Sequence, residues 1–233
     1  MKTVLITGGS RGIGAATAAL FSKNGYRVII NYNKSEKEAL ELAEKIGGLA
    51  IKADISDYVQ VQKMFESAGN VDILINNAGI AQQKLFTDIS FEEWHRMLDV
   101  NLSGVFYCCK CALPYMINQK AGCIINISSM WGICGASCEV HYSAAKSGVI
   151  GLTKALAKEV GPSGITVNCI APGMIDTEMN SMLDDETKAL VMEETPLGIT
   201  GTVEDIAQCA LYLAQNGRFI TGQVLSPNGG LVI

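Results

Sequence analysis

Short apolar segments alternate with longer helical segments along most of this chain. The apolar segments have the length and composition of buried strands and occupy residues 3–6, 27–31, 49–53, 72–76, 123–127 and 166–170. Apolar residues recur with helical spacing at 12–24, 35–46, 57–68, 91–119, 142–160 and 203–215, and 91–119 is long enough for two helices. Strands separated by helices pair in parallel, and strands that are apolar on both faces are covered on both sides. The order therefore predicts an α/β fold with a doubly wound parallel sheet.

One domain is expected to hold all of residues 1–233. A chain of 233 residues, 48% hydrophobic and 18% charged, can bury one large core but not two ordinary ones. No linker rich in Pro, Ser or Gly divides the chain, and no repeat recurs at a fixed period. Residues 172–202 are the most irregular stretch, and so long a connection in a compact domain predicts a mobile lid or substrate loop.

Charge and hydropathy argue against several classes of partner. The formal net charge is −5 and Lys and Arg do not cluster, which argues against a nucleic-acid surface because phosphate binding needs grouped cations. No uncharged apolar run reaches the roughly 18 residues of a membrane span, and the N-terminus has no signal-peptide core. We therefore expect a cytoplasmic protein with no membrane partner.

The cysteines predict no metal site. The chain has eight cysteines and two histidines. Cys108 and Cys111 have the spacing of a zinc or redox pair, but no second pair with ligand spacing exists. Most of the cysteines fall in apolar or helical patterns, so we expect reduced, buried thiols and no bound metal.

A glycine-rich loop directly follows the first expected strand. Residues 7–14 read Thr-Gly-Gly-Ser-Arg-Gly-Ile-Gly and lead into an alanine-rich helix. Glycines let the backbone turn tightly and approach a pyrophosphate, whose charge is favoured at a helix N-terminus. A tight turn without a ligand is the alternative, but the position between first strand and first helix favours a dinucleotide. The expected cofactor contacts here are Gly8, Ser10, Arg11, Gly12, Ile13 and Gly14.

The residues after the second strand indicate which dinucleotide is bound. Sites that prefer NAD(H) usually place an Asp or Glu there to bind the ribose 2′-hydroxyl. Residues 31–34 read Asn-Tyr-Asn-Lys, so no carboxylate is present, and Asn33 is expected to contact the cofactor. Arg11, with Lys34 as a second cation, is suited to a 2′-phosphate. NADP(H) is therefore expected, and a solvated surface cation is the alternative for Arg11.

Tyr142 and Lys146 lie one turn apart on one face of the expected helix at 142–160. A tyrosine hydroxyl, with a pKa of about 10, is a poor proton donor or acceptor at neutral pH unless a nearby cation stabilises its phenolate. We therefore expect Lys146 to lower the pKa of Tyr142. Ser129, at the end of a strand, is suited to hydrogen-bond a substrate carbonyl, with Ser128 as the second choice. A serine that only caps the backbone is the alternative for either one.

Five elements, in this order and spacing, resemble the short-chain dehydrogenase/reductase family. They are the glycine loop at 7–14, Asn76-Asn77-Ala78-Gly79, Ser129, the Tyr142/Lys146 pair and Pro172-Gly173. The resemblance spans nearly the whole chain and implies a Rossmann-like fold. It also implies carbonyl reduction, in which hydride passes from the nicotinamide to the carbonyl carbon while Tyr142 protonates the oxygen.

The same resemblance implies further roles. Lys146 would also hold the nicotinamide ribose, and Asn101 would hold a water for proton relay, an ordinary turn asparagine being the alternative. Asp54 would contact the adenine, with Ile55 beside the ring. The other implied contacts are Asn77, Ala78 and Gly79 under the cofactor and Pro172, Gly173, Ile175 and Thr177 near the nicotinamide. In this family the helices at 102–119 and 142–160 pair across subunits, which implies a dimer or a homotetramer.

Within the family the chain most resembles the 3-oxoacyl-(acyl-carrier-protein) reductases of fatty acid biosynthesis. Those reductases dock acidic acyl carrier protein through cations near the substrate mouth. At two commonly basic positions this chain has Lys120 and Ser163, so one steering charge is missing. Reduction of a 3-oxoacyl thioester is our first hypothesis.

Glu139 leaves the identity of the substrate undecided. It stands where carrier-protein reductases usually have Gln or Asn, and its segment resembles bacterial reductases of a 5-aminopentanone group on elongation factor P. A carboxylate beside the pocket would favour an amine-bearing substrate. A solvated acid at a helix N-terminus is the alternative. The elongation factor P reductase is therefore the second hypothesis, and a non-catalytic NADP-sensing regulator is the third.

Overall fold

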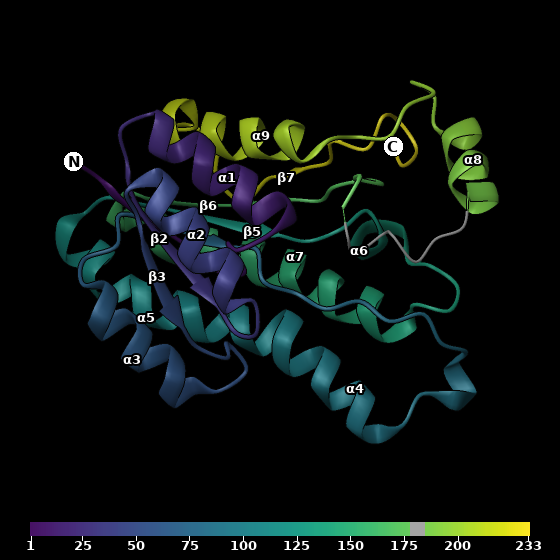
Figure 1. The fold of residues 1–233 in the computed structure, drawn as a ribbon, viewed down its shortest axis with the longest axis horizontal. Helices are drawn as coiled ribbons and strands as arrows, with labels where there is room; N and C mark the ends of the chain where they lie inside the picture. The colour runs from purple at the N-terminus through teal and green to yellow at the C-terminus, as the bar shows by residue number, and fades with distance from the viewer. Residues whose placement is uncertain (178–184) are drawn as a thin grey trace.

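Seven parallel strands form one sheet in the computed structural model, which describes residues 1–177 and 185–233 (Figure 1). The spatial order is β3-β2-β1-β4-β5-β6-β7. β1 pairs with both β2 and β4, so the winding direction reverses there, and in such sheets the ligand crevice lies beyond the carboxyl ends of the strands. The strands are β1 Thr3–Ile6, β2 Arg27–Tyr32, β3 Leu49–Lys52, β4 Ile73–Asn76, β5 Gly122–Ile127, β6 Ile165–Ile170 and β7 Val224–Leu225.

Helices cover both faces of the sheet. α1, α2 and α9 lie on one side of it, and α3, α5 and α7 lie on the other (Figure 1). The α-helices are α1 Gly12–Lys23, α2 Glu36–Ile46, α3 Tyr58–Ala68, α4 Phe91–Leu98, α5 Gly104–Gln119, α6 Trp131–Cys134, α7 Val140–Val160, α8 Asp185–Glu194 and α9 Val203–Asn216. Three short helical segments are η1 Phe86–Asp88, η2 Asp99–Ser103 and η3 Gly161–Ser163, of which η2 is a π-turn.

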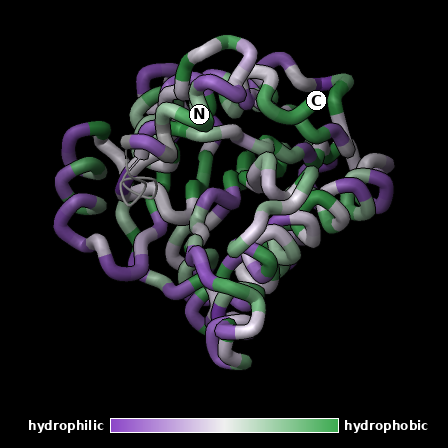
Figure 2. The backbone as a smooth tube through the Cα atoms, turned by 90° about the vertical axis from the view of Figure 1, so that its right-hand side faces the viewer, coloured by the Kyte–Doolittle hydropathy of each residue, from purple (hydrophilic) through white to green (hydrophobic). Residues whose placement is uncertain are grey.

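The two helical layers bury two hydrophobic clusters, one on each face of the sheet. Successive side chains of a strand point to opposite faces, so Leu5 of β1 packs in the cluster with Met116 and Val149, whereas Val4 packs with Phe21. Figure 2 shows hydrophobic segments gathered in the interior and hydrophilic turns on the outer helices. The predicted α/β fold, a doubly wound and Rossmann-like parallel sheet, is confirmed.

The six expected strands and the main helices are present, with ends shifted by one or two residues. The expected long helix at 91–119 is divided by η2 into α4 and α5. The sequence pattern missed β7 and α6, because elements of two and four residues are too short to show a period.

The irregular stretch at 172–202 contains structure that the pattern did not predict. Helix α8 forms its second half, and Ile175 pairs with Gly201 in an isolated parallel bridge. Residues 178–184, which belong to the same expected loop, lie outside the described residues. Its role as a mobile lid stays a prediction.

The stretch Phe91–Gln119 is long and apolar enough, by length and composition, to cross a membrane. Of its apolar window, 44% is buried inside the fold, and Val105, Cys108 and Met116 belong to the core cluster under α5. A core helix of a soluble protein has the same composition, so this stretch is weak evidence for a membrane span.

Candidate active site

The first turns of α7 bring Tyr142 and Lys146 to the carboxyl end of β5. Both side chains are buried, at 9% and 4% exposure, and Ser129, just beyond β5, is exposed by 8%. Tyr142 packs with Met97 and Ala145 in a small apolar cluster. The predicted group of Ser129, Tyr142 and Lys146 is therefore assembled in one place, at the edge of the sheet where the fold puts its crevice.

Lys146 is held by the end of β5. Its Nζ donates a 2.9 Å hydrogen bond to the carbonyl oxygen of Ile127 and lies 5.7 Å from the centroid of the Tyr142 ring. Burial lowers the pKa of Lys146 to about 8, because desolvation disfavours the ammonium form. The side chain is therefore a cation at neutral pH that loses its proton more easily than an exposed lysine.

Tyr142 does not have the lowered pKa that the spacing predicts. Burial raises the pKa of Tyr142 to about 12, the hydrogen bond with Ser129 opposes this rise, and the charge of Glu139 adds to it. The expectation that Lys146 would leave Tyr142 with a lowered pKa is wrong for the free site, because desolvation of the phenolate outweighs the favourable interactions. Tyr142 is thus a protonated hydroxyl, ready to donate.

The two serines after β5 have different surroundings. Ser128 Oγ donates a 2.8 Å hydrogen bond to the backbone oxygen of Lys146, so this hydroxyl ties β5 to α7. Ser129 Oγ accepts a 3.2 Å hydrogen bond from the Trp131 backbone and also interacts with the Tyr142 hydroxyl. Of the two candidates, only Ser129 faces the reacting hydroxyl.

Asn101 lies in the π-turn η2, fully buried. Its Oδ1 accepts from the Ile80 amide at 3.0 Å, and its Nδ2 donates to the Ile80 carbonyl at 2.9 Å. A Cβ atom on Gly79 would lie 2.7 Å from Asn101 Oδ1 and 3.4 Å from Lys146 Nζ, so the three residues meet. Single π-turns inside α-helices are frequent at functional sites, and this one places Asn101 on Gly79, beside Lys146.

The glycine loop fits tightly against the loop that follows β4. Gly8 has a φ of +61°, and a Cβ atom there would lie 2.8 Å from the Cα of Ala78. Asn77 Nδ2 donates to the carbonyl oxygens of Thr7 and Gly8 at 3.1 and 3.0 Å, and Thr7 Oγ1 accepts from the Ala78 amide at 3.1 Å. These contacts hold the backbone close to the start of α1.

The start of α1 is suited to a pyrophosphate. Arg11 is the N-cap residue of α1 and is exposed, its side chain making no cap hydrogen bond. No acidic residue stands in the first helical turn, so the positive end of the helix dipole is not neutralised. Gly12, Gly14 and the half-buried Ser10 and Ile13 complete the loop, so the cradle fits the dinucleotide that the sequence predicts.

Asp54 is paired at the edge of the crevice near β2 and β3. Its Oδ2 lies 3.2 Å from Arg96 of α4, and its Oδ1 accepts from Ser56. These hydrogen bonds, with the charge of Arg96, lower the pKa of Asp54 against the opposing effect of burial, which is the largest of the separate effects. Ile55 beside it is buried, and Asn33 just after β2 is exposed.

The residues expected near the nicotinamide follow β6. Pro172 is buried, and its carbonyl oxygen accepts from the Met130 amide at 2.9 Å, which joins this loop to the Ser129 segment. A Cβ atom on Gly173 would lie 2.6 Å from Asn228 Cα. Thr177 lies across from the glycine loop, 3.6 Å from the position of a Cβ on Gly12. The loops after β1, β5 and β6 thus lie side by side at the carboxyl edge of the sheet, with Ile175 buried behind.

Lys120 and Ser163 lie elsewhere. Lys120 precedes β5 and Ser163 precedes β6, so both are at the amino edge of the sheet, opposite Ser129. A Cβ atom on Gly164 would lie 2.5 Å from the Lys120 carbonyl oxygen, which places the two turns side by side. The expectation of a steering cation beside the substrate mouth is therefore wrong within a single chain, because the strand polarity separates the two edges.

Glu139 is the N-cap residue of α7 and is half-buried. Its Oε1 accepts a 3.3 Å hydrogen bond from Gln83, its side chain does not cap the helix, and burial raises its pKa. The carboxylate is near enough to raise the pKa of Tyr142. It is therefore part of the site's electrostatics and not a fully solvated surface acid.

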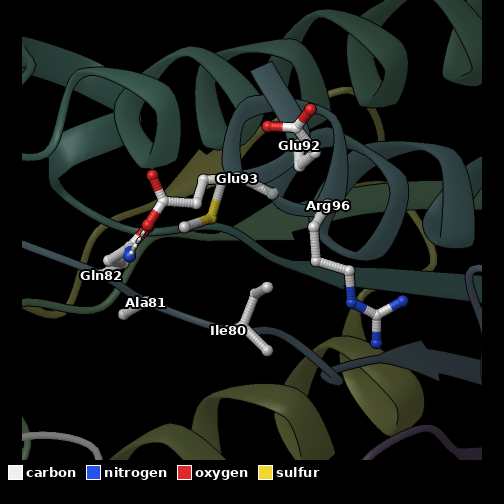
Figure 3. Close-up of a pocket in the computed structure, with 7 residues that line it drawn as sticks. Ile80, Ala81, Gln82, Glu92, Glu93 and Arg96 are labelled. Atoms are coloured by element: carbon white, nitrogen blue, oxygen red, sulfur yellow. Dashed lines mark hydrogen bonds between the residues drawn. The ribbon is translucent and has the colours of Figure 1, made fainter. Parts of the chain in front are cut away.

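A cavity of about 450 Å³ lies between α4 and the segment after β4 (Figure 3). None of the residues around it was predicted from the sequence. Glu93 could have been found, because Ser90 followed three residues later by Glu93 is the signature of a capping box, and the structure contains that box. The cavity is lined by Ile80, Ala81, Gln82, Glu92, Glu93, Arg96 and Met97.

Comparison with known proteins agrees with this geometry. The family model described as enoyl-(acyl carrier protein) reductase matches residues 8–232. A protein of Chlamydia muridarum is 44% identical over 240 residues, which cover 99% of this chain and 97% of that protein. A protein of Staphylococcus aureus strain N315 is 40% identical, with 99% and 98% covered. Both relatives are named 3-oxoacyl-(acyl-carrier-protein) reductase.

Proposed function

This chain belongs to the short-chain dehydrogenase/reductase family and is an oxidoreductase acting on a ketone or alcohol group, and we propose that it reduces 3-oxoacyl thioesters on acyl carrier protein with NADPH. The observation that carries the proposal is the placement of the Tyr142 side chain, buried beside Lys146 and Ser129. The names of the relatives support the substrate, and fatty acid biosynthesis is the process in which we place the protein.

The residues of this chain supply the proton donor and orient the substrate and the cofactor. Ser129 donates a hydrogen bond to the substrate carbonyl oxygen, and Tyr142 gives that oxygen its proton. Lys146 stabilises the phenolate left on Tyr142 and binds the ribose hydroxyls, and Asn101 holds a water that returns the proton. The reduced nicotinamide, when bound, supplies hydride to the carbonyl carbon. The glycine loop and the start of α1 would hold the pyrophosphate of the cofactor.

The choice of NADP(H) rests on charge at the second strand. Asn33 follows β2 where a carboxylate would repel a 2′-phosphate, and Arg11 stands exposed at the N-cap of α1. An Arg11→Ala variant should lose at least about 10-fold in kcat/KM with NADPH and change little with NADH, because a charge-assisted hydrogen bond contributes about 1.5–3 kcal/mol. Equal loss with both cofactors would overturn the role of Arg11.

The experiment that tests the function compares oxidation of NADPH on four substrates. They are an acetoacetyl thioester, a 2-enoyl thioester, an amino-ketone and a simple sugar or steroid ketone, with NADH as the cofactor control. We expect turnover of the acetoacetyl thioester above all, with a loss of ~100-fold or more in Tyr142→Phe. Turnover of the enoyl thioester alone, or full activity in Tyr142→Phe, would overturn the proposal.

We also propose a subunit assembly and a cellular location. The pairing of α5 and α7 across subunits, which the family resemblance implies, would give a dimer or tetramer in the cytoplasm. Because Lys120 lies at the edge opposite Ser129, a carrier protein bound there would need a second subunit to reach a site. Light scattering decides the assembly, and a monomer at assay concentration would overturn it.

A further inference from the structure

His141 is a buried titratable group that the proposed mechanism does not use. It lies in the first turn of α7, immediately before Tyr142, and has 0% exposure. Its Nε2 lies 3.0 Å from Gln82 Oε1, and its Nδ1 is buried without a hydrogen-bond partner in the described structure. An unpaired polar atom in a buried place costs free energy, so the presence of a histidine at this position needs an explanation.

The hydrogen bonds of Gln82 decide which nitrogen of His141 carries the proton. Gln82 Nε2 donates a 2.8 Å hydrogen bond to Glu93 Oε1, and a carboxylate only accepts. The amide oxygen of Gln82 therefore faces His141 and accepts, so His141 Nε2 is the donor. Nδ1 is then an unprotonated lone pair. Burial also lowers the pKa of His141, which agrees with a neutral ring.

Glu93 anchors the other end of this chain of hydrogen bonds. Lys84 Nζ donates to both carboxylate oxygens of Glu93, at 2.8 and 2.7 Å. Glu93 also accepts from the Ser90 amide and completes the capping box of α4. Figure 3 shows Gln82 and Glu93 meeting at the rim of the cavity. The first turn of α4 is thus fixed to the same segment as His141.

The segment between β4 and η1 links these contacts to Asn101. Ile80 in this segment exchanges two hydrogen bonds with Asn101, and Gln82 bonds His141. The Lys84 backbone amide, further along the segment, donates a 2.7 Å hydrogen bond to the carbonyl oxygen of Cys138, just before α7. A three-point attachment of this kind fixes the distance between the first turn of α7 and the π-turn.

We infer that His141 is a positioning residue that, through Gln82, holds Tyr142 in register with Asn101. The inference rests on the proposed function, since it concerns the geometry of the same proton transfer. The apolar contact of Met97 with Tyr142 is not directional, and the His141–Gln82–Glu93 hydrogen bonds add directional contacts between the first turn of α7 and α4. A misplacement of about 1 Å at a reacting group costs ~100-fold in rate, so a small slide matters.

The test uses three single variants, the double variant of His141→Phe with Gln82→Met, and one matched control. His141→Phe and Gln82→Met each break the chain, His141→Gln keeps a side-chain N–H that can reach Gln82, and His95→Phe removes the exposed histidine of α4. We measure kcat, the KM for acetoacetyl thioester and the dissociation constant of NADPH, with thermal unfolding beside them.

The expected pattern separates positioning from mere stability. His141→Phe and Gln82→Met should each lower kcat by ~10-fold or more while KM and the NADPH dissociation constant stay within about 2-fold. The double variant should be no slower than either single one, because both remove the same connection. His141→Gln should recover most of kcat, and His95→Phe should match the wild type.

Two results would overturn the inference. One is an unchanged kcat in His141→Phe or, should that variant fail to fold, in Gln82→Met. The other is multiplied losses in the double variant, which would mean that the residues act separately. If the wild type itself reduces no 3-oxoacyl thioester, the proposed function fails instead. In that case the same variants, assayed on whichever ketone the wild type does reduce, still test the positioning role.

Discussion

Lys146 Nζ lies 5.7 Å from the centroid of the Tyr142 ring, one helical turn away, while it donates to the carbonyl oxygen of Ile127. This hydrogen bond fixes the cation beside the phenol without neutralising it. Burial acts on the pair in opposite senses, because it raises the pKa of Tyr142 to about 12 and lowers the pKa of Lys146 to about 8. The site therefore favours a neutral phenol and a cation that titrates close to neutral pH.

The rate of reduction should fall as pH rises through about 8. Below that pH, Lys146 is an ammonium ion that stabilises the phenolate formed when Tyr142 gives up its proton. Above it, Lys146 is neutral while Tyr142, with a pKa of about 12, remains protonated. The alkaline limb of kcat/KM thus belongs to Lys146. It should vanish in Lys146→Met, whose low rate should not vary with pH, and an unchanged limb there would contradict the assignment.

Asn101→Ala should destabilise the fold by about 2 kcal/mol, because both backbone groups of Ile80 lose their partner in a partly buried place. Asn118, exposed near the end of α5, is the matched control, and Asn118→Ala should change stability by less than about 0.5 kcal/mol. Urea unfolding measures both. Equal effects would mean that the Asn101 hydrogen bonds do not matter for the fold.

Gly14→Ala and Gly151→Ala should act in opposite directions, although both glycines lie within helices. A Cβ atom on Gly14 would collide with the Gly8 carbonyl oxygen and lie 2.6 Å from Asn77 Nδ2, whereas Gly151 has no neighbour within 4 Å of the added atom. Gly151→Ala should stabilise by about 0.5–1 kcal/mol. Gly14→Ala should destabilise by about 1–3 kcal/mol and weaken NADPH binding. Thermal unfolding and titration with NADPH are the measurements. If Gly14→Ala stabilised the protein, the claim that the loop leaves no room for a Cβ atom at Gly14 would be wrong.

Glu139→Gln should lower the pKa of Tyr142, because the negative charge that opposes the phenolate is removed. The pH at which the reverse reaction, alcohol oxidation, gains its base should then move downward. The kcat/KM for acetoacetyl thioester should change by less than about 3-fold if Glu139 makes no contact with an acyl substrate. A loss of ~10-fold or more confined to the amino-ketone would instead identify Glu139 as a residue that selects an amine.

The sequence was enough for the fold and for the identity of the chemical groups. Strand and helix periods predicted six of the strands in the described residues, because each period is set within a few residues of chain. Two other features also depend on only a few consecutive residues. They are the one-turn spacing of Tyr142 and Lys146 and the glycine loop before α1. The brief strand Val224–Leu225 exists only because β6 provides an edge for it, and no local pattern announces such a strand.

The sequence did not predict the contacts that join distant segments. The hydrogen bonds of Asn101 with Ile80 and of His141 with Gln82 connect residues 21 and 59 positions apart, and neither has a local signature. Lys120 was expected near the substrate because the family resemblance implied it, although its place just before the strand at 123–127 puts it at the edge opposite Ser129.

The amino-acid order by itself determined which groups this protein brings to a reaction: a phenol, a lysine, a serine and a glycine loop at fixed spacings. Only the tertiary structure decided their protonation, because desolvation depends on what surrounds a side chain and not on its neighbours in sequence. Lys146 and Tyr142 show the difference. Their spacing predicted a lowered phenol pKa, and their burial gives a raised one.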